Sequence, residues 1–271
     1  MSPILLLAAA AALTSLTVDR QENWLILKSP DLPGGEIRIN YLEAYCRANS
    51  HSTDWVSHTV VKHKSTVVEK TPKRIRLRDL VSDGVTVDHT ISARADGVEF
   101  RLVAKNATAK DSEAHWAQPC IRLGAFTGFD ADHRKGNIDD YLGKCFVFLD
   151  GKLSTMPTRD WVKEARYMPG QVWRAPGILP EDVNPRPLNP NVPSNGLIGC
   201  FSGDNKTIFA TAWEPYQELF QGIARCIHSD FRLGGLKAGE KKEIRGRIYL
   251  VPNDVPALLR QYERDFGRAK K

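Results

Sequence analysis

The chain has 271 residues, of which 42% are hydrophobic and 26% are charged, a composition typical of folded globular proteins. It excludes wholesale disorder, collagen-like repeats and coiled coils, and no apolar run approaches the roughly 18 residues of a membrane-spanning helix. The formal charge is +6 at pH 7. Residues 232–271 contain 11 basic and 5 acidic residues, which leaves 27 of each sign elsewhere, so the excess belongs to the C-terminal end.

The first 16 residues are typical of an export signal. Ile4–Leu16 is apolar and too short to span a bilayer, and Ala10–Ala12 offers a small-x-small cleavage site, although no Lys or Arg precedes it. The alternative is a buried N-terminal segment. We expect residues 1–16 to be a signal peptide and the mature chain, without membrane insertion, to be secreted or periplasmic.

Residues 85–104 predict the clearest hairpin in the chain. Apolar and polar residues alternate through 85–94, Asp96-Gly97 supplies a tight turn, and the alternation resumes at Val98. Many short strands separated by turn signals predict an all-β sandwich or a closed barrel. The other β-rich runs are 24–27, 36–41, 59–63, 74–77, 120–123, 145–149, 207–212 and 242–251.

One helix is predicted, at residues 254–266, where Asp254 caps an apolar stripe. Seven prolines in residues 169–193 predict a stiff, irregular surface loop, and long ordered loops often carry function. Trp173 lies in this loop as a candidate for stacking on a ligand. We expect residues 17–271 to form a single domain.

Five cysteines are spread along the chain without a C-x-x-C pair, which argues against zinc ribbons and thioredoxin-type motifs. They could form one or two disulfides in an oxidising compartment or stay as free buried thiols. These residues are Cys46, Cys120, Cys145, Cys200 and Cys226.

A first candidate site begins at a strand entrance. His115, Trp116, Gln118 and Arg122 combine a proton-transfer group, a stacking face and two polar side chains. Sugars are bound by such a combination, because their C–H faces stack on aromatics while their hydroxyls take directional hydrogen bonds. The alternative is that His115 and Trp116 only pack beneath a loop.

A second candidate site follows the predicted strand 207–212. Glu214, flanked by Trp213 and Tyr216, could be desolvated enough to act as an acid or base, and Gln217 could bind substrate. Glu218 is the competing carboxylate. Solvated loop acids are the alternative.

A third polar stretch, residues 51–58, places His51 and His58 where they could line a cleft. Their spacing matches no zinc motif, and we expect no metal. The sequence also lacks a G-x-S-x-G elbow, a P-loop and a G-x-G-x-x-G loop, so we expect no nucleotide and no other cofactor.

From Val85 onward the chain resembles the galactose mutarotase-like β-supersandwich group, which includes aldose epimerases and the sandwich domains of several polysaccharide lyases. The resemblance implies an antiparallel supersandwich with one C-terminal helix. It is carried by Phe100–Thr108, His115-Trp-Ala-Gln, Trp213-Glu-Pro-Tyr-Gln and the turn Leu236–Glu240 before a last strand.

By this resemblance, His115 corresponds to the general acid that protonates the ring oxygen and Glu214 to the base at the anomeric hydroxyl. Two features depart from the epimerase pattern. Asn-x-x-His-Gly-Gly is absent, with Asn49-Ser-His51 a loose substitute, and the glutamate motif reads Glu-Pro-Tyr-Gln instead of Glu-Thr-Gln.

Three functions remain open, all with carbohydrate as the partner: epimerase-like proton transfer at an anomeric centre, polysaccharide lyase or other glycan-cleaving activity, and non-catalytic carbohydrate binding. Nucleic acid is not expected, because the basic C-terminal end has no interleaved aromatics to stack bases. A lyase base could be His51, His58, Tyr41 or Tyr45, with Arg47 or Arg122 neutralising a uronate. The expected substrate-binding residues are Trp116, Gln118, Arg122, Trp173, Trp213, Gln217, His51 and His58.

Overall fold

The computed structural model describes residues 15–49, 54–129, 138–160, 171–184, 187–222 and 225–267. The predicted signal peptide lies outside these residues except for Ser15 and Leu16, and Leu16 packs into the main core. No helix in the described ranges is both long and apolar enough to cross a bilayer.

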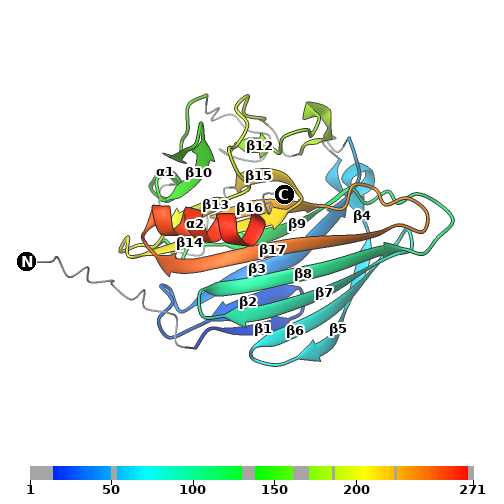
Figure 1. The fold of residues 1–271 in the computed structure, drawn as a ribbon, viewed down its shortest axis with the longest axis horizontal. Coiled ribbons are helices and arrows are strands. Elements are labelled where there is room, and N and C mark those ends of the chain that lie inside the picture. Colours follow the sequence, from blue (N-terminus) through cyan, green and yellow to red (C-terminus); the bar gives the residue numbers. More distant parts are fainter. Residues whose placement is uncertain are drawn as a thin grey trace, which may run out of the picture.

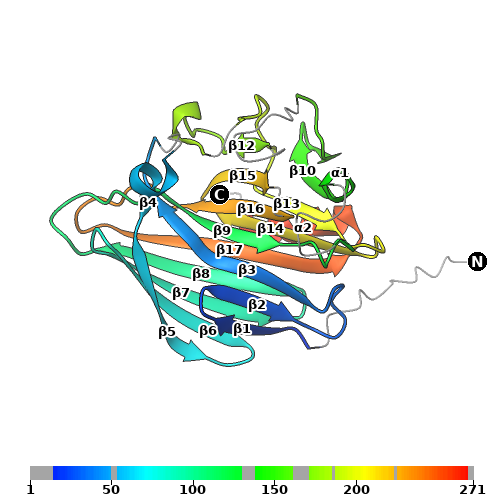
Figure 2. The same ribbon diagram turned by 180° about the vertical axis from the view of Figure 1, so that it is seen from behind.

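The strands form two sheets that pack face to face, in which every strand pair is antiparallel (Figures 1 and 2). This confirms the predicted all-β sandwich. The eight-stranded sheet has the order β1 (Thr17–Gln21), β2 (Trp24–Lys28), β3 (Glu36–Cys46), β9 (Trp116–Arg122), β16 (Cys226–Arg232), β15 (Tyr216–Gly222) and β12 (Val172–Arg174), with β4 (Val60–Val61) paired to β3. The nine-stranded sheet has the order β11 (Lys152–Thr155), β10 (Cys145–Leu149), β13 (Ile198–Phe201), β14 (Thr207–Glu214), β17 (Lys241–Pro252), β8 (Gly97–Asn106), β7 (Val85–Arg94), β6 (Arg74–Val81) and β5 (His63–Lys70).

The predicted hairpin is present as β7 and β8, which pair from Val85 opposite Asn106 to Arg94 opposite Gly97. Its alternating apolar side chains enter the core between the sheets, because successive side chains of a strand point to opposite faces. Gly97 has a φ of +140°, and a Cβ at this position would lie 1.8 Å from the backbone oxygen of Ile248 on β17. The turn therefore needs glycine for both conformation and space.

Several strands differ from the predicted runs. β9 begins at Trp116 instead of at residue 120, β3 continues to Cys46, and the predicted run 59–63 is divided between β4 and β5. β16 was not predicted, because six of its seven residues are buried and no exposed face marks it as a strand. Sheets with both faces covered lose the polar alternation that identifies a strand.

The core between the sheets contains a buried polar network. The Tyr45 hydroxyl donates to Asp79 Oδ2 at 2.7 Å, and Tyr41 Oη lies 2.8 Å from Nδ1 of His89. His89 Nε2 lies 3.1 Å from the same Asp79 oxygen. The network joins β3 of one sheet to β6 and β7 of the other, and each of its side chains has a polar partner inside the apolar core.

The predicted C-terminal helix is α2 (Val255–Phe266), which begins after Asp254; the Asp254 side chain accepts from the Ala257 N–H at 2.9 Å. Leu258 and Phe266 pack on the outer surface of the nine-stranded sheet, where α2 lies in Figure 1. A second, short helix, α1 (Ile138–Leu142), was not predicted.

The proline-rich segment is more ordered than predicted. Within residues 171–184, β12 pairs with β15 and forms the edge of the eight-stranded sheet, and a 3₁₀ turn follows at Pro180–Asp182. Val172, Ile178 and Val183 form a small apolar cluster. We call residues 171–184, which include this strand and the 3₁₀ turn, the strap.

Gly97→Ala should lower the free energy of unfolding by about 2 kcal/mol or more, because its Cβ overlaps the backbone of β17. Urea denaturation measures the change. Gly239→Ala is the matched control, since Gly239 also has positive φ (+78°) but no atom near its Cβ position, and it should cost only about 1 kcal/mol. Equal losses in the two variants would contradict the steric role of Gly97.

Candidate functional site

The outer face of the eight-stranded sheet, opposite the main core, carries a row of buried polar side chains; Figure 2 is drawn from this side. Ile121 of β9 and Ile227 and Phe231 of β16 point into the main core. Alternate residues of the two strands therefore point to the outer face. We call the following residues the outer-face cluster: Trp116, Gln118, Cys120, Arg122, Cys226, His228, Asp230, Arg232 and, from β15, Glu218.

The centre of the cluster is a carboxylate pair. Glu218 of β15 lies directly opposite Asp230 of β16, and both are 0% exposed. Burial and then the negative charge of Asp230 raise the pKa of Glu218 well above its usual value, while burial raises the pKa of Asp230 to about 6. Two neighbouring buried carboxyls cannot both ionise readily, so the pair retains a proton near neutral pH. Such a pair can give or take a proton.

The strap is tied to one end of the cluster. Arg232 Nη1 lies 3.1 Å from Asp182 Oδ2, and the backbone N–H of Asn49 donates to Asp182 Oδ1 at 2.9 Å. The Gln217 side chain donates to the Asp182 carbonyl at 2.6 Å and accepts from Arg232. The predicted substrate-binding residue Gln217 thus holds the strap in place.

At its other end the cluster meets the surface. Arg122 is half-buried and Glu43, on β3, is exposed. Glu43 lies in the irregular part of β3, between Asn40, which is opposite Cys120, and Ala44, which is opposite Gln118, so it lies beside β9. Glu43 also lines a cavity of about 370 Å³, a size suited to a small polar ligand. Its other polar lining residues include Arg20, Asn23, His63 and Ser65.

Two thiols and an imidazole meet next to the carboxylate pair. The ligand atoms of Cys120, Cys226 and His228 all lie within 4.8 Å of one another. A hydrogen bond with Cys120 and the neighbouring His228 hold the pKa of Cys226 well below its usual value. Burial alone would lower the pKa of His228, but Cys226 and Asp230 raise it to about 10. A thiolate and an imidazolium therefore stabilise each other here.

The predicted catalytic residues His115 and Glu214 lie near the same end of β16, since Leu233 N–H donates to the His115 carbonyl and Arg232 N–H to that of Pro215. Their side chains have different neighbours. The His115 ring packs against Gly235, and burial lowers its pKa, which Asp182 partly offsets.

The sequence led us to expect that Glu214 is desolvated. Its side chain is instead exposed to solvent. Burial raises the pKa values of Tyr216 and Tyr262, and the charge of Glu214 adds to both; Tyr262 belongs to α2 on the outer side of the nine-stranded sheet. Neither His115 nor Glu214 lines the cavity beside Glu43.

Of the three tryptophans expected to stack on a sugar, only Trp116 points to the outer face, where it is buried beside Cys46 and Trp55. Trp173 and Trp213 belong to the main core. Trp213 packs between Phe100 and Phe231, with ring centroids 5.0 and 4.8 Å away. Both rings are buried against core side chains. Neither Trp173 nor Trp213 is therefore placed to stack on a ligand in the way that the sequence had led us to expect.

His58 is exposed in a π-helical turn, Trp55–Thr59, with Nδ1 3.5 Å from Asp54. His51 lies outside the described residues. Tyr41 and Tyr45 are committed to the buried Asp79 network, and burial raises their pKa values well above the usual range. Neither tyrosine is placed to serve as a lyase base.

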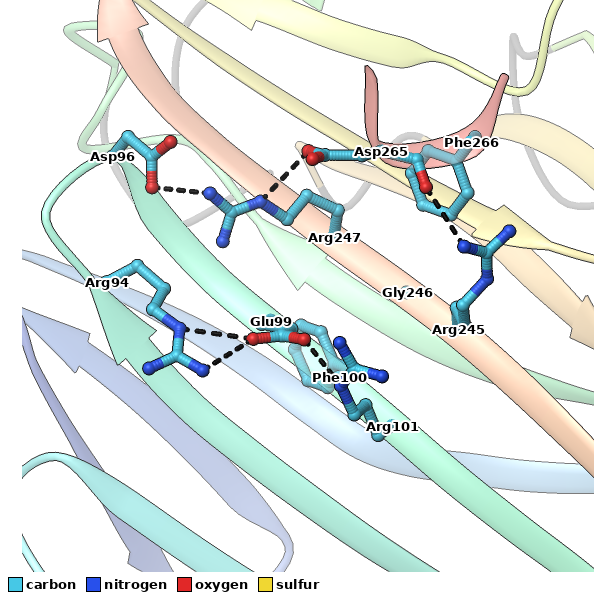
Figure 3. Close-up of a pocket in the computed structure, with 10 residues that line it drawn as sticks. All are labelled: Arg94, Asp96, Glu99, Phe100, Arg101, Arg245, Gly246, Arg247, Asp265 and Phe266. Atoms are coloured by element: carbon cyan, nitrogen blue, oxygen red, sulfur yellow. Dashed lines mark hydrogen bonds and ion pairs between the residues drawn. The ribbon is translucent and has the colours of Figure 1, made fainter. Parts of the chain in front are cut away.

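A second cavity, of about 280 Å³, lies between α2, β8 and β17 (Figure 3). Glu99 binds two of its arginines, and Arg247 lies between Asp96 and Asp265. Most of the positive charge of this cavity is therefore paired internally. Its charged lining is Arg94, Arg101, Arg245, Arg247, Asp96, Glu99 and Asp265.

Gln118 and Arg122 lie in the outer-face cluster, on either side of Cys120 along β9. Asp230 and His228 were not predicted. The alternating segment Cys226-Ile-His-Ser-Asp-Phe-Arg232 is the signal that would have found them, since it places four chemically active side chains on one face of a strand.

No family model matches the chain, and no curated protein matches it. Among solved structures, a galactose mutarotase-like protein from Lactobacillus casei is similar, with 11% identity, 87% of this chain and 99% of that chain covered, and a TM-score of 0.44. A galactose mutarotase-like protein from Clostridium acetobutylicum has 8% identity, coverage of 86% and 94%, and a TM-score of 0.40.

A galactose mutarotase related enzyme from Lactobacillus acidophilus has 9% identity, coverage of 87% and 97%, and a TM-score of 0.40. These proteins carry the name of the group that the sequence resembles. Similarity at this level assigns no activity and no residue role to the chain.

Proposed function

We propose that this chain is a carbohydrate-active enzyme that transfers protons at the anomeric centre of a sugar, with Glu218 and Asp230 as its acid–base pair. The observation that carries the proposal is the fully buried, directly opposed position of these two carboxyls on neighbouring strands. Burying two carboxyls costs free energy, and functional sites are where such costs are concentrated.

Mutarotation needs one proton donated and one removed. The protonated carboxyl of the pair gives its proton to the ring oxygen while a carboxylate accepts the proton of the anomeric hydroxyl, and the ring opens. Rotation of the aldehyde and the reverse transfers close the ring as the other anomer. The reaction leaves the total number of protons unchanged, so the pair is restored at each turnover.

The polar surroundings fit a sugar. Gln118 and Arg122 offer directional hydrogen bonds on the same face as Asp230, and Glu43, beside β9, lines a cavity of about 370 Å³. Since Glu218 and Asp230 are fully buried, substrate must displace part of their covering to reach them. Export, predicted from residues 1–16, would bring the protein to extracellular glycans.

Lyase activity is less well supported, because the candidate bases Tyr41 and Tyr45 are bonded within the core. Non-catalytic binding would use Gln118 and Arg122 but leaves the buried carboxylate pair without a role.

Glu218→Gln should slow anomer exchange by roughly 100- to 10,000-fold, because an amide cannot transfer the proton. Exchange is measured by NMR on a panel of reducing sugars, with new ultraviolet absorbance from acidic polysaccharides as the lyase assay. Glu214→Gln is the matched control, because Glu214 is an exposed carboxylate on β14 of the other sheet and its loss should leave wild-type rates.

Full activity in Glu218→Gln, or loss only in Glu214→Gln, would remove Glu218 from the mechanism and favour the residue implied by the sequence resemblance. Sugar binding without exchange in the wild-type protein would identify a binding module instead.

Glu218→Gln should also change how the melting temperature depends on pH. Burial raises the folded-state pKa of Glu218, so its contribution to stability is complete below the unfolded value of about 4.3 and decreases as pH rises. Glu218→Gln cannot ionise, so its melting temperature relative to wild type should increase between about pH 5 and about pH 8. A difference that stays constant across this window would show that Glu218 is not desolvated.

A further inference from the structure

Three side chains able to bind a metal meet on the outer face although the chain separates them widely. Cys120 comes from β9, and Cys226 and His228 come from β16. Pairing of Cys226 with Arg122 and of Ile227 with Ile121 aligns the two strands so that all three side chains share one face. Spacing along the chain, which predicts no metal site, cannot reveal this arrangement.

The distances suit a tetrahedral ion. All three ligand atoms lie within 4.8 Å of one another, and Cys226 Sγ is 3.5 Å from His228 Nε2. With metal–sulfur bonds of about 2.3 Å, two tetrahedral ligands lie about 3.8 Å apart. Only small side-chain shifts are therefore needed to enclose an ion.

The donor set selects a thiophilic divalent cation. Two thiolates and one neutral imidazole favour Zn²⁺ over Mg²⁺ or Ca²⁺, which prefer oxygen ligands. Two thiolates also cancel the charge of Zn²⁺, so the buried site would carry no net charge. Arg122, two residues after Cys120 and directly opposite Cys226, places a guanidinium beside both thiols.

A carboxylate stands behind the imidazole. While Nε2 of His228 faces Cys226, its Nδ1 lies 3.6 Å from Asp230 Oδ1. Metal-binding histidines commonly donate their other ring N–H to a carboxylate, which fixes the tautomer and aims the lone pair at the metal. Asp230 is in place to orient His228 in this way.

We infer that Cys120, Cys226 and His228 bind one Zn²⁺ ion, with Asp230 as a positioning residue and the fourth coordination position open. This inference does not depend on the proposed sugar chemistry, because its measurement is metal content and not turnover.

The full chain, expressed with zinc and purified under reducing conditions, should contain about one zinc per molecule by elemental analysis. Protein produced with Co²⁺ should show thiolate-to-cobalt charge-transfer bands and the intense visible bands of tetrahedral cobalt. Cys226→Ser and Cys120→Ser should each reduce bound metal to less than about a tenth of the wild-type content. Asp230→Asn should weaken binding about 10- to 100-fold while leaving the cobalt bands recognisable.

Cys145→Ser with Cys200→Ser is the matched control, because these buried thiols pair with Sγ atoms 2.8 Å apart in the other sheet. That double variant should keep its zinc. Circular dichroism checks the folding of each variant, and the wild-type cobalt spectrum tests the site even where a variant fails to fold.

Wild-type protein without zinc and without cobalt bands would overturn the inference. So would a Cys120–Cys226 disulfide found by mass spectrometry in protein that takes up no metal after reduction. Metal loss in the Cys145 and Cys200 control would assign the ion to other residues. Failure of the sugar proposal would show instead as normal metal content with no exchange activity.

Discussion

Burial of both faces of β9 and β16 is the constraint on which the rest of the molecule depends. One face supplies Ile121, Ile227 and Phe231 to the core between the sheets. The other face, which in a two-layer sandwich would meet water, is buried as well. Polar groups on this second face must form hydrogen bonds or ion pairs, because burying an unpaired polar group destabilises the fold. The carboxylate pair of Glu218 and Asp230 exists at this place because the strands are covered twice.

The same constraint explains which strands the sequence predicted. β7 and β8 were predicted correctly because one side of the hairpin is wet, so alternation is written into residues 85–106. β16 was missed because water does not mark its second face. The strand in the proline-rich segment was also missed, because β12 forms by pairing with β15, which is distant in the sequence.

The structure brings some of the candidate residues onto one face and separates others, according to strand register. Gln118 and Arg122 share the face of the cluster because they are two and six residues beyond Trp116 on one strand. Glu214 is the last residue of β14, so its side chain belongs to the other sheet, whereas Glu218, weighed as its competitor, comes four residues later on β15. Trp213 was drawn inward, because its apolar area is best satisfied between Phe100 and Phe231.

The position of Asp230 assigns different roles to the two carboxyls. Asp230 lies between the positively charged or metal-directed ring of His228 and the carboxyl of Glu218. A cationic partner stabilises the ionised form of Asp230, whereas Glu218 has an anion as its closest charged neighbour. In the proposed mechanism, this asymmetry would make Glu218 the proton donor and Asp230 the acceptor. A metal ion on Cys120, Cys226 and His228 would influence this proton through His228. The ring of His228 faces Asp230, and Asp230 in turn faces Glu218, so a change in the charge of the ring would change the charge that Glu218 meets.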